Sequence, residues 1–159
     1  MQDAGEKGTL ASALEQEHRE IDRAIEDYLA SSDDDESRIE ALEQTMTALR
    51  RHIYLEEEFL FPPLRDAGFV APVFVMLREH GELWDTMGTI ERELADDPAE
   101  VPGRCKWLLA QLAKHNAKEE PILYPHADGV LGAPASAELV TFLERGRIPD
   151  GWVCAGASA

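Results

Sequence analysis

Two stretches of the chain, HIYLEEEFLFP at residues 52–62 and HNAKEEPILYP at residues 115–125, align without gaps. They share a histidine, two consecutive glutamates, a leucine, an aromatic residue and a proline at the same places. In each stretch the histidine and the first glutamate are four residues apart, and side chains at that spacing are neighbours on one face of a helix. The sequence therefore carries a repeated His-x-x-x-Glu pair on two predicted helices.

A second pair of matching stretches lies upstream, LEQEHREI at residues 14–21 and MLREHGEL at residues 76–83. By subtraction, His18 and His52 are 34 residues apart, and His80 and His115 are 35 apart. An α-helix rises about 1.5 Å per residue, so two antiparallel helices joined near the middle of each interval bring their histidines to one height. Each half is therefore predicted to be a helical hairpin, with all four histidines in one layer.

The apolar residues recur at spacings of three and four, which predicts an all-α fold. The predicted helices cover about residues 9–30, 36–61, 72–95 and 99–124, with a polar turn at 31–35. Pro62 and Pro63 are expected to end the second helix, and Pro121 to kink or shorten the fourth. We predict an up-down antiparallel four-helix bundle of two repeated hairpins at residues 9–127, and a short C-terminal extra helix, at about 135–145, within a peripheral segment at 128–159.

The composition narrows the possible partners. The chain has 159 residues and a formal net charge of −17, which suits one domain with a packed core and disfavours binding to nucleic acid or anionic membranes. The two cysteines, Cys105 and Cys154, form no CxxC pair, so neither a disulfide framework nor a zinc–cysteine site is expected. The first residues lack the pattern of a signal peptide, and no apolar run is long enough to span a bilayer. A cytoplasmic location is expected.

The repeated histidines and glutamates predict a metal site. Both His-x-x-x-Glu pairs lie on the apolar stripe of their helices, and burying such groups without partners costs several kcal/mol each. Metal binding is the usual way in which such a set is tolerated. The predicted ligands are His18, His52, Glu56, His80, His115 and Glu119. Imidazoles and carboxylates without a thiolate suit iron, with manganese or zinc as weaker choices.

Two other metal sites do not fit the spacing. A ferritin-like di-iron bundle needs Glu-x-x-His pairs on two helices, and only Glu15 and His18 have that form. A zincin needs an HExxH motif, which the sequence lacks.

The combined motifs, over about residues 14–125, resemble the hemerythrin-like, HHE cation-binding domain family. The resemblance implies a bundle with a non-haem di-iron centre whose two iron ions share an oxo or hydroxo bridge. The ligands that it implies are His18 and His52 on one iron, His80 and His115 on the other, and Glu56 and Glu119 as bridges.

One position departs from the oxygen-carrying members that this sequence resembles. They have an HxxxH pair on the third helix, but the residue four after His80 is Trp84, so one iron loses an imidazole and keeps an open position. Trp84 is a candidate wall of the ligand pocket. Asp22, four after His18, is either an extra ligand or a partner of that histidine. Glu57 and Glu120 are either partners of the ligands or solvated, and His126 is not expected to bind metal.

These features lead to two hypotheses of function. The first is binding or turnover of a small oxidant, hydrogen peroxide, oxygen or nitric oxide, at an open iron position, with catalase-like activity as one form. The second is an iron, redox or oxygen sensing module without catalysis, with minor iron storage as a further alternative. The expected partner is a small diatomic or peroxide ligand, with an unidentified redox or protein partner left open.

Overall fold

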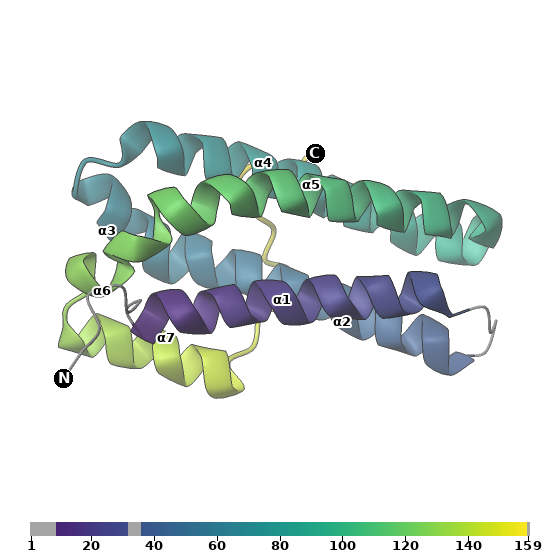
Figure 1. Ribbon diagram of the computed structural model, residues 1–159, viewed down its shortest axis with the longest axis horizontal. Helices are drawn as coiled ribbons and strands as arrows, with labels where there is room; N and C mark the ends of the chain where they lie inside the picture. Colours follow the sequence, from purple (N-terminus) through teal and green to yellow (C-terminus); the bar gives the residue numbers. More distant parts are fainter. Residues whose placement is uncertain (1–8, 32–35, 159) are drawn as a thin grey trace.

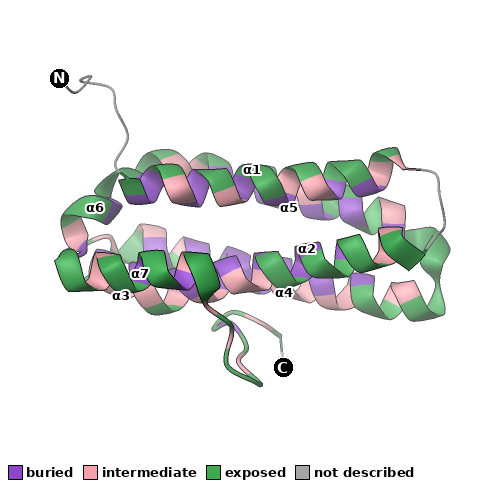
Figure 2. Cartoon of the chain, turned by 90° about the horizontal axis from the view of Figure 1, so that it is seen from below, coloured by how far each residue is buried: buried purple, intermediate pink, exposed green. Residues whose placement is uncertain are grey.

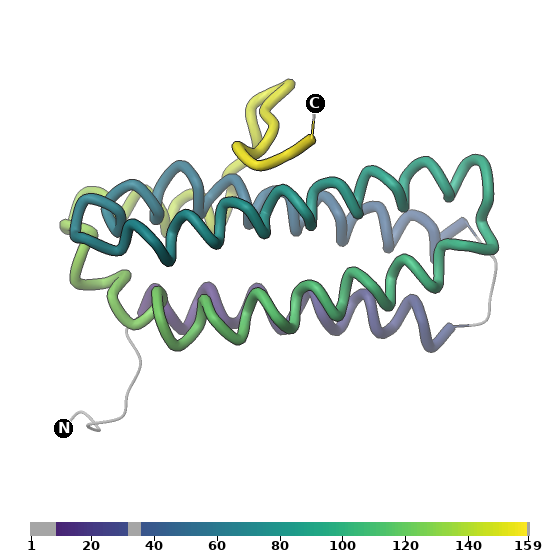
Figure 3. Tube along the Cα trace, turned by 90° about the horizontal axis from the view of Figure 1, so that it is seen from above, coloured from purple at the N-terminus to yellow at the C-terminus, as the bar shows by residue number. Residues whose placement is uncertain are grey.

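The chain is an all-α, up-down antiparallel four-helix bundle in a computed structural model that describes residues 9–31 and 36–158 (Figure 1). Its long helices are α1 (Thr9–Ala30), α2 (Glu36–Leu55), α4 (Val70–Asp96) and α5 (Val101–Ile122). Helix α1 packs on α2 and α5, and α4 packs on α5 and α2 (Figure 3). The two predicted hairpins are confirmed as α1–α2 and α4–α5. The predicted turn at 31–35 lies outside the described residues except for Ser31.

The prediction that Pro62 and Pro63 end the second helix is wrong. Helix α2 continues into a π-helical turn, η1 (Glu56–Leu60), and then into α3 (Phe61–Asp66), which carries both prolines in its first turn. The backbone N–H of Phe61 bonds to the carbonyl of Glu56, five residues earlier. Proline has no N–H and its ring crowds the carbonyl four residues back, but it fits the first turn of a helix. The π turn therefore lets the chain restart a helix at the prolines.

The second hairpin ends differently. Pro121 lies in the last turn of α5, which ends one residue later as predicted, and the Leu123 N–H bonds to the Glu119 carbonyl at 2.9 Å. Two short elements follow, the 3-10 turn η3 (Tyr124–His126) and α6 (Ala127–Val130). Another 3-10 turn, η2 (Pro98–Glu100), joins α4 to α5. Beyond the predicted layer of four histidines, the chain thus continues through a π turn in the first half and a 3-10 turn in the second.

The short C-terminal helix is α7 (Ala133–Arg145), and it packs on α2. The Arg51 guanidinium donates to the carbonyl oxygens of Phe142, Leu143 and Gly146 and so caps the C-terminal end of α7. The following tail, residues 146–158, runs along the outer side of α2 and α4 (Figure 3). There the tail backbone lies against Gly81, where an added Cβ would be 2.0 Å from a carbonyl oxygen of the tail.

Buried residues line the faces that the four helices turn toward one another (Figure 2). They form two apolar clusters. One contains Leu14, Leu60 and Tyr124 at the end near α3 and α6, and the other contains Ile25 and Met87 at the opposite end. The predicted metal ligands lie between the two clusters along each helix. None of the helices in the described ranges has the length and apolar character needed to cross a membrane.

Candidate metal centre

Each of the four long helices contributes one histidine to the layer between the clusters: His18 on α1, His52 on α2, His80 on α4 and His115 on α5. The two glutamates of the His-x-x-x-Glu pairs lie one turn further along. Glu56 is the first residue of the π turn, and Glu119 lies in α5. None of the six side chains is more than 5% exposed. The structure therefore brings all six predicted ligands into one buried layer.

The six residues form two groups that share both glutamates. His18 and His52 form one group with Glu56 and Glu119, and His80 and His115 form the other with the same two glutamates. In each group the donor atoms lie within 4.8 Å of one another. We call these the His18–His52 group and the His80–His115 group.

Each shared carboxylate divides its oxygens between the groups. Glu56 Oε2 lies 3.5 Å from His52 Nε2, and Oε1 lies 3.0 Å from His80 Nε2. Glu119 Oε1 lies 3.1 Å from His18 Nε2, and Oε2 lies 3.3 Å from His115 Nε2. One oxygen toward each pair of imidazoles is the arrangement that a carboxylate needs to bridge two cations.

Four further glutamates hold the outer nitrogens of the imidazoles, and we call them the outer carboxylates. The Nδ1-to-carboxylate pairs are His18 with Glu120 at 2.8 Å, His52 with Glu17 at 2.7 Å, His80 with Glu57 at 2.8 Å and His115 with Glu79 at 2.9 Å. A hydrogen bond from Nδ1–H to a carboxylate fixes the tautomer and leaves Nε2 free to bind a metal. All four imidazoles therefore present Nε2 to the centre of the bundle.

The outer carboxylates follow the sequence repeat. Glu17 and Glu79 precede His18 and His80 and act within their own hairpins, whereas Glu57 and Glu120 reach across to the other hairpin. The alternative left open for Glu57 and Glu120 is thereby decided in favour of contact with the histidines. Sequence reasoning assigned no role to Glu17 and Glu79, although their shared Glu-His pairs marked them.

The carboxylates dominate the electrostatics of the layer. Burial by itself opposes protonation of His115, but Glu119 and Glu79 outweigh it and raise its pKa to about 10. The pKa of His52 is raised well above its ordinary value in the same way, by Glu56 and Glu17. Burial also disfavours a charged Glu119, yet the neighbouring imidazoles, His115 foremost, hold its pKa well below the usual range. Protons thus offset the acidic charge in this layer, and cations binding to the same atoms would displace them.

The donor set fits a pair of cations. Glu119 Oε2 is buried and makes no hydrogen bond within the described part of the chain. In the His18–His52 group, the two Nε2 atoms are 3.0 Å apart. Two ligand atoms at right angles on one ion, with bonds of about 2 Å, are separated by roughly 2.8 Å. The spacing of these nitrogens and oxygens is therefore that of ligands sharing an ion.

One residue of the centre was not predicted from the sequence. The Tyr124 hydroxyl lies 2.6 Å from Glu56 Oε2 and 2.8 Å from His18 Nε2. Burial, together with the carboxylates of Glu119 and Glu56, raises the pKa of this phenol well above its ordinary value. The repeat marked the position as aromatic, but the first half has Phe61 there, so the hydroxyl had no matching signal.

A small cavity of about 10 Å³ opens beside the ligands. That is roughly the space that one water-sized molecule requires. Its remaining walls are mainly aliphatic, formed by Ile21, Leu49, Ile53, Leu83 and Leu112. The cavity is therefore enclosed mainly by aliphatic side chains, with Asp22 and Asn116 as further polar lining residues, and it has room only for a very small molecule.

Asp22 and Trp84, which occupy equivalent positions in the two halves, lie differently with respect to the cavity. Asp22 lines it, and its Oδ1 is buried with no hydrogen bond among the described residues. Burial raises the pKa of this carboxyl group. The prediction that Trp84 walls the pocket is wrong, because its ring packs on Trp152 and lies near the Arg50 guanidinium. Asp22 thus remains a candidate extra ligand, whereas Trp84 lies outside the pocket.

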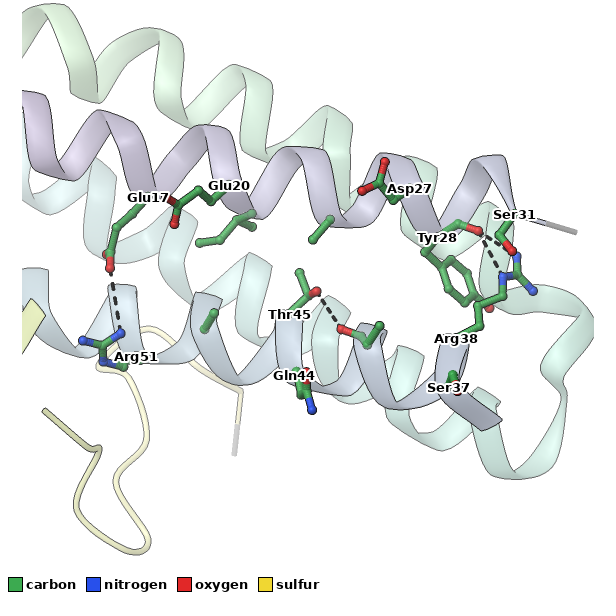
Figure 4. Close-up of a pocket in the computed structure, with 14 residues that line it drawn as sticks. Glu17, Glu20, Asp27, Tyr28, Ser31, Ser37, Arg38, Gln44, Thr45 and Arg51 are labelled. Atoms are coloured by element: carbon green, nitrogen blue, oxygen red, sulfur yellow. Dashed lines mark hydrogen bonds and ion pairs between the residues drawn. The ribbon is translucent and has the colours of Figure 1, made fainter. Parts of the chain in front are cut away.

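The fifth histidine and a groove between α1 and α2 lie apart from the four ligand imidazoles. His126 is exposed and its ring packs on Phe69, as expected for a residue outside the centre. A groove of about 630 Å³ runs between α1 and α2 (Figure 4). Arg51 and Glu17 face each other at one end of it, 3.9 Å apart. Two residues of the groove also belong to the candidate centre: Glu17 holds His52, and Ile21 lines the cavity beside the ligands.

Comparison with known proteins agrees with this geometry. A family model described as Hemerythrin HHE cation binding domain matches residues 9–139. No curated protein and no solved structure matches the chain. The matched range includes both groups and all four outer carboxylates.

Proposed function

Because the chain belongs to the Hemerythrin HHE cation-binding domain family, we propose that it holds two non-haem iron ions and binds or turns over a small oxidant. The candidate oxidants are hydrogen peroxide, oxygen and nitric oxide, with catalase-like decomposition of peroxide as one form of the activity. The observation that carries the proposal is the division of the Glu56 and Glu119 oxygens between two pairs of imidazoles. This arrangement suits two adjacent ions.

In the proposal, His18 and His52 would hold one ion, and His80 and His115 would hold the other. Glu56 and Glu119 would each give one oxygen to each ion. The cofactor is two iron ions joined by an oxo or hydroxo bridge, and when bound it supplies the redox chemistry. The chain's own residues orient and enclose the site. The outer carboxylates hold each imidazole with Nε2 inward, and their negative charge increases the basicity of the ligands.

The cavity supports a small substrate. Its volume of about 10 Å³ is close to that of one water-sized molecule, which favours a ligand of very few heavy atoms over an organic substrate. The aliphatic walls keep bulk water from the ligands and strengthen electrostatic interactions at the centre. Larger reductants would then have to deliver electrons from the surface of the bundle.

The first experiment measures iron content and the ultraviolet–visible spectrum of the purified protein before and after addition of hydrogen peroxide, together with evolved oxygen. The proposal expects about two irons per chain, a spectrum that changes with peroxide, and oxygen release. His115→Ala should lose iron, whereas His126→Ala is the matched control because that exposed imidazole lies outside the centre. Absence of bound iron would refute the proposal.

A specific contact favours the sensing alternative. The backbone N–H of Ala155 donates to Glu57 Oε1 at 3.0 Å, and Glu57 Oε2 holds His80. A change in iron loading or oxidation state could alter the position of the C-terminal tail through this carboxylate. Limited proteolysis of the tail with ferric, ferrous and metal-free protein tests the alternative, which expects cleavage rates to differ by state while peroxide turnover is absent.

A further inference from the structure

The Tyr124 hydroxyl contacts every member of the His18–His52 group. Its Oη lies 2.8 Å from His18 Nε2 and 3.1 Å from His52 Nε2. It also lies 2.6 Å from Glu56 Oε2 and 2.9 Å from Glu119 Oε1. The side chain is fully buried, and its ring stacks on the His18 imidazole with the ring centroids 5.2 Å apart. The hydroxyl therefore lies within the donor set of one group.

These distances are those between ligands of a single ion. Donors at right angles on an ion with bonds of about 2 Å are separated by roughly 2.8 Å. Oη lies between 2.6 and 3.1 Å from all four ligand atoms of the group, so a single ion bound there would be within reach of all five atoms. A hydroxyl that only formed a hydrogen bond to a buried carboxylate would need one close acceptor atom. The Tyr124 hydroxyl instead has four possible metal-ligand atoms close to it.

Beside the His80–His115 group, the sequence repeat has an aromatic ring at the equivalent position but no hydroxyl. Phe61 occupies the position equivalent to Tyr124 and stacks on His80, with centroids 5.3 Å apart. It is as well buried as Tyr124, with 2% exposure. The two groups thus match in imidazoles and shared carboxylates and differ by one phenol oxygen.

We propose that Tyr124 binds through Oη, as a phenolate, to the ion held by His18 and His52, and that an external ligand therefore binds the ion held by His80 and His115. The inference rests on the proposed di-iron site. The first ion then has five donors from these residues, the four of its group and Oη, against four for the second. The phenol proton passes to solvent as the metal binds, as for other protein ligands. Tyrosine oxygen is an established iron ligand, as in haem catalases.

The ferric protein tests the ligand directly. Phenolate bound to ferric iron gives a visible charge-transfer band, and resonance Raman excitation in that band enhances tyrosinate vibrations. We expect both signals in the unaltered protein with two irons per chain. Tyr124→Phe should abolish them while keeping both irons, because the ring packing remains. Tyr54→Phe is the matched control, since Tyr54 packs on Phe142 and Trp152 away from the ligands.

The outcomes separate this inference from the proposed function. Two bound irons without phenolate signals, or signals that persist in Tyr124→Phe, would overturn the ligand assignment and leave the di-iron site standing. Failure to bind iron would overturn both. The Raman measurement on the unaltered protein decides the question even if Tyr124→Phe does not fold.

Azide, a small anion that binds ferric iron, tests which ion is open. We expect the unaltered protein to bind one azide per two irons. Phe61→Tyr adds a hydroxyl beside the His80–His115 group and should weaken azide binding at least tenfold. Tyr124→Phe should instead allow a second azide to bind. Undiminished azide affinity in Phe61→Tyr, or a single azide in Tyr124→Phe, would contradict the assignment of the open ion.

Discussion

The two hairpins, α1–α2 and α4–α5, provide nearly the same set of side chains to the centre, yet they surround it differently. Each gives two imidazoles, one shared carboxylate and two outer carboxylates at equivalent positions. The differences lie in the residues next to this set. Tyr124 in one half corresponds to Phe61 in the other, and Asp22 corresponds to Trp84. The C-terminal tail bonds to Glu57, the outer carboxylate behind His80.

The two hairpins differ beside the candidate ligands and not in the ligands themselves. The residues that the donor geometry requires match in the two halves, because each pair of histidines needs the same neighbours. Positions about one helical turn from these ligands do not have to match in this way, so their residues can differ between the halves. Any difference between the two proposed ions would therefore come from the flanking residues and not from the repeated ligands.

The largest effect is expected from the shared glutamates. Glu56→Ala and Glu119→Ala each remove a donor from both groups, so each should lower iron affinity more than about 100-fold, beyond the loss typical of an outer partner. Iron per chain after gel filtration measures the loss. Glu58→Ala is the control, since that exposed side chain pairs with Trp152. Retention of one iron by either variant would mean that the groups bind independently.

Removal of iron tests how far the halves depend on each other. Binding at a free ligand concentration of 100 times Kd stabilises a protein by about 2.7 kcal/mol. For a chain of this size, that corresponds to a fall in Tm of roughly 5–10 °C on chelation. Both hairpins should lose protection together, because Glu56 and Glu119 belong to both groups. Hydrogen exchange that increases in only one hairpin would show that the two halves do not depend on each other.

The outer carboxylates of the two hairpins are expected to contribute equally to iron affinity. Glu17→Gln and Glu79→Gln remove the negative charge behind His52 and His115, which should reduce iron affinity about 10- to 100-fold in each case. Competition with a chelator measures the affinities. Glu43→Gln, on the exposed face of α2, is the control. If only one of the two variants loses affinity, the equivalent positions do not have equivalent roles.

The smallest effect is expected at the tail. A Cβ on Gly81 would lie 2.0 Å from the Gly156 carbonyl oxygen, so Gly81→Ala should displace the tail and break the Ala155 bond to Glu57. Loss of one hydrogen bond, about 0.5–1.5 kcal/mol, corresponds to roughly 2- to 10-fold faster release of iron to a chelator. Arg19→Ala, at the equivalent position of α1, should release iron at the unaltered rate. Equal rates for both variants would show that the tail does not support His80.

Most of the fold could be read from the sequence because it depends on local periodicity. The spacing of apolar residues located the four long helices and the short C-terminal one, and the repeat paired them into hairpins. The error at Pro62 and Pro63 has a local cause. Sequence rules treat proline as a helix end, but a preceding π turn allows the chain to continue as a new helix.

The six side chains that meet in the buried layer could also be predicted from the sequence. His and Glu four residues apart must share a helix face, and equal intervals between the histidines of each half must bring them to one height. These constraints follow from the geometry of a single helix and a single turn. They required no knowledge of how the hairpins face each other.

Only the tertiary structure decided which side chains meet across the bundle. Whether Glu120 reaches His18, whether the Tyr124 oxygen enters a donor set and whether Trp84 faces the cavity or Trp152 all depend on the rotation and separation of packed helices. Those quantities are set by the packing of the two apolar clusters, not by residue spacing within one helix. The six candidate ligands could therefore be predicted from the sequence, whereas the difference between the two groups arises from the packing.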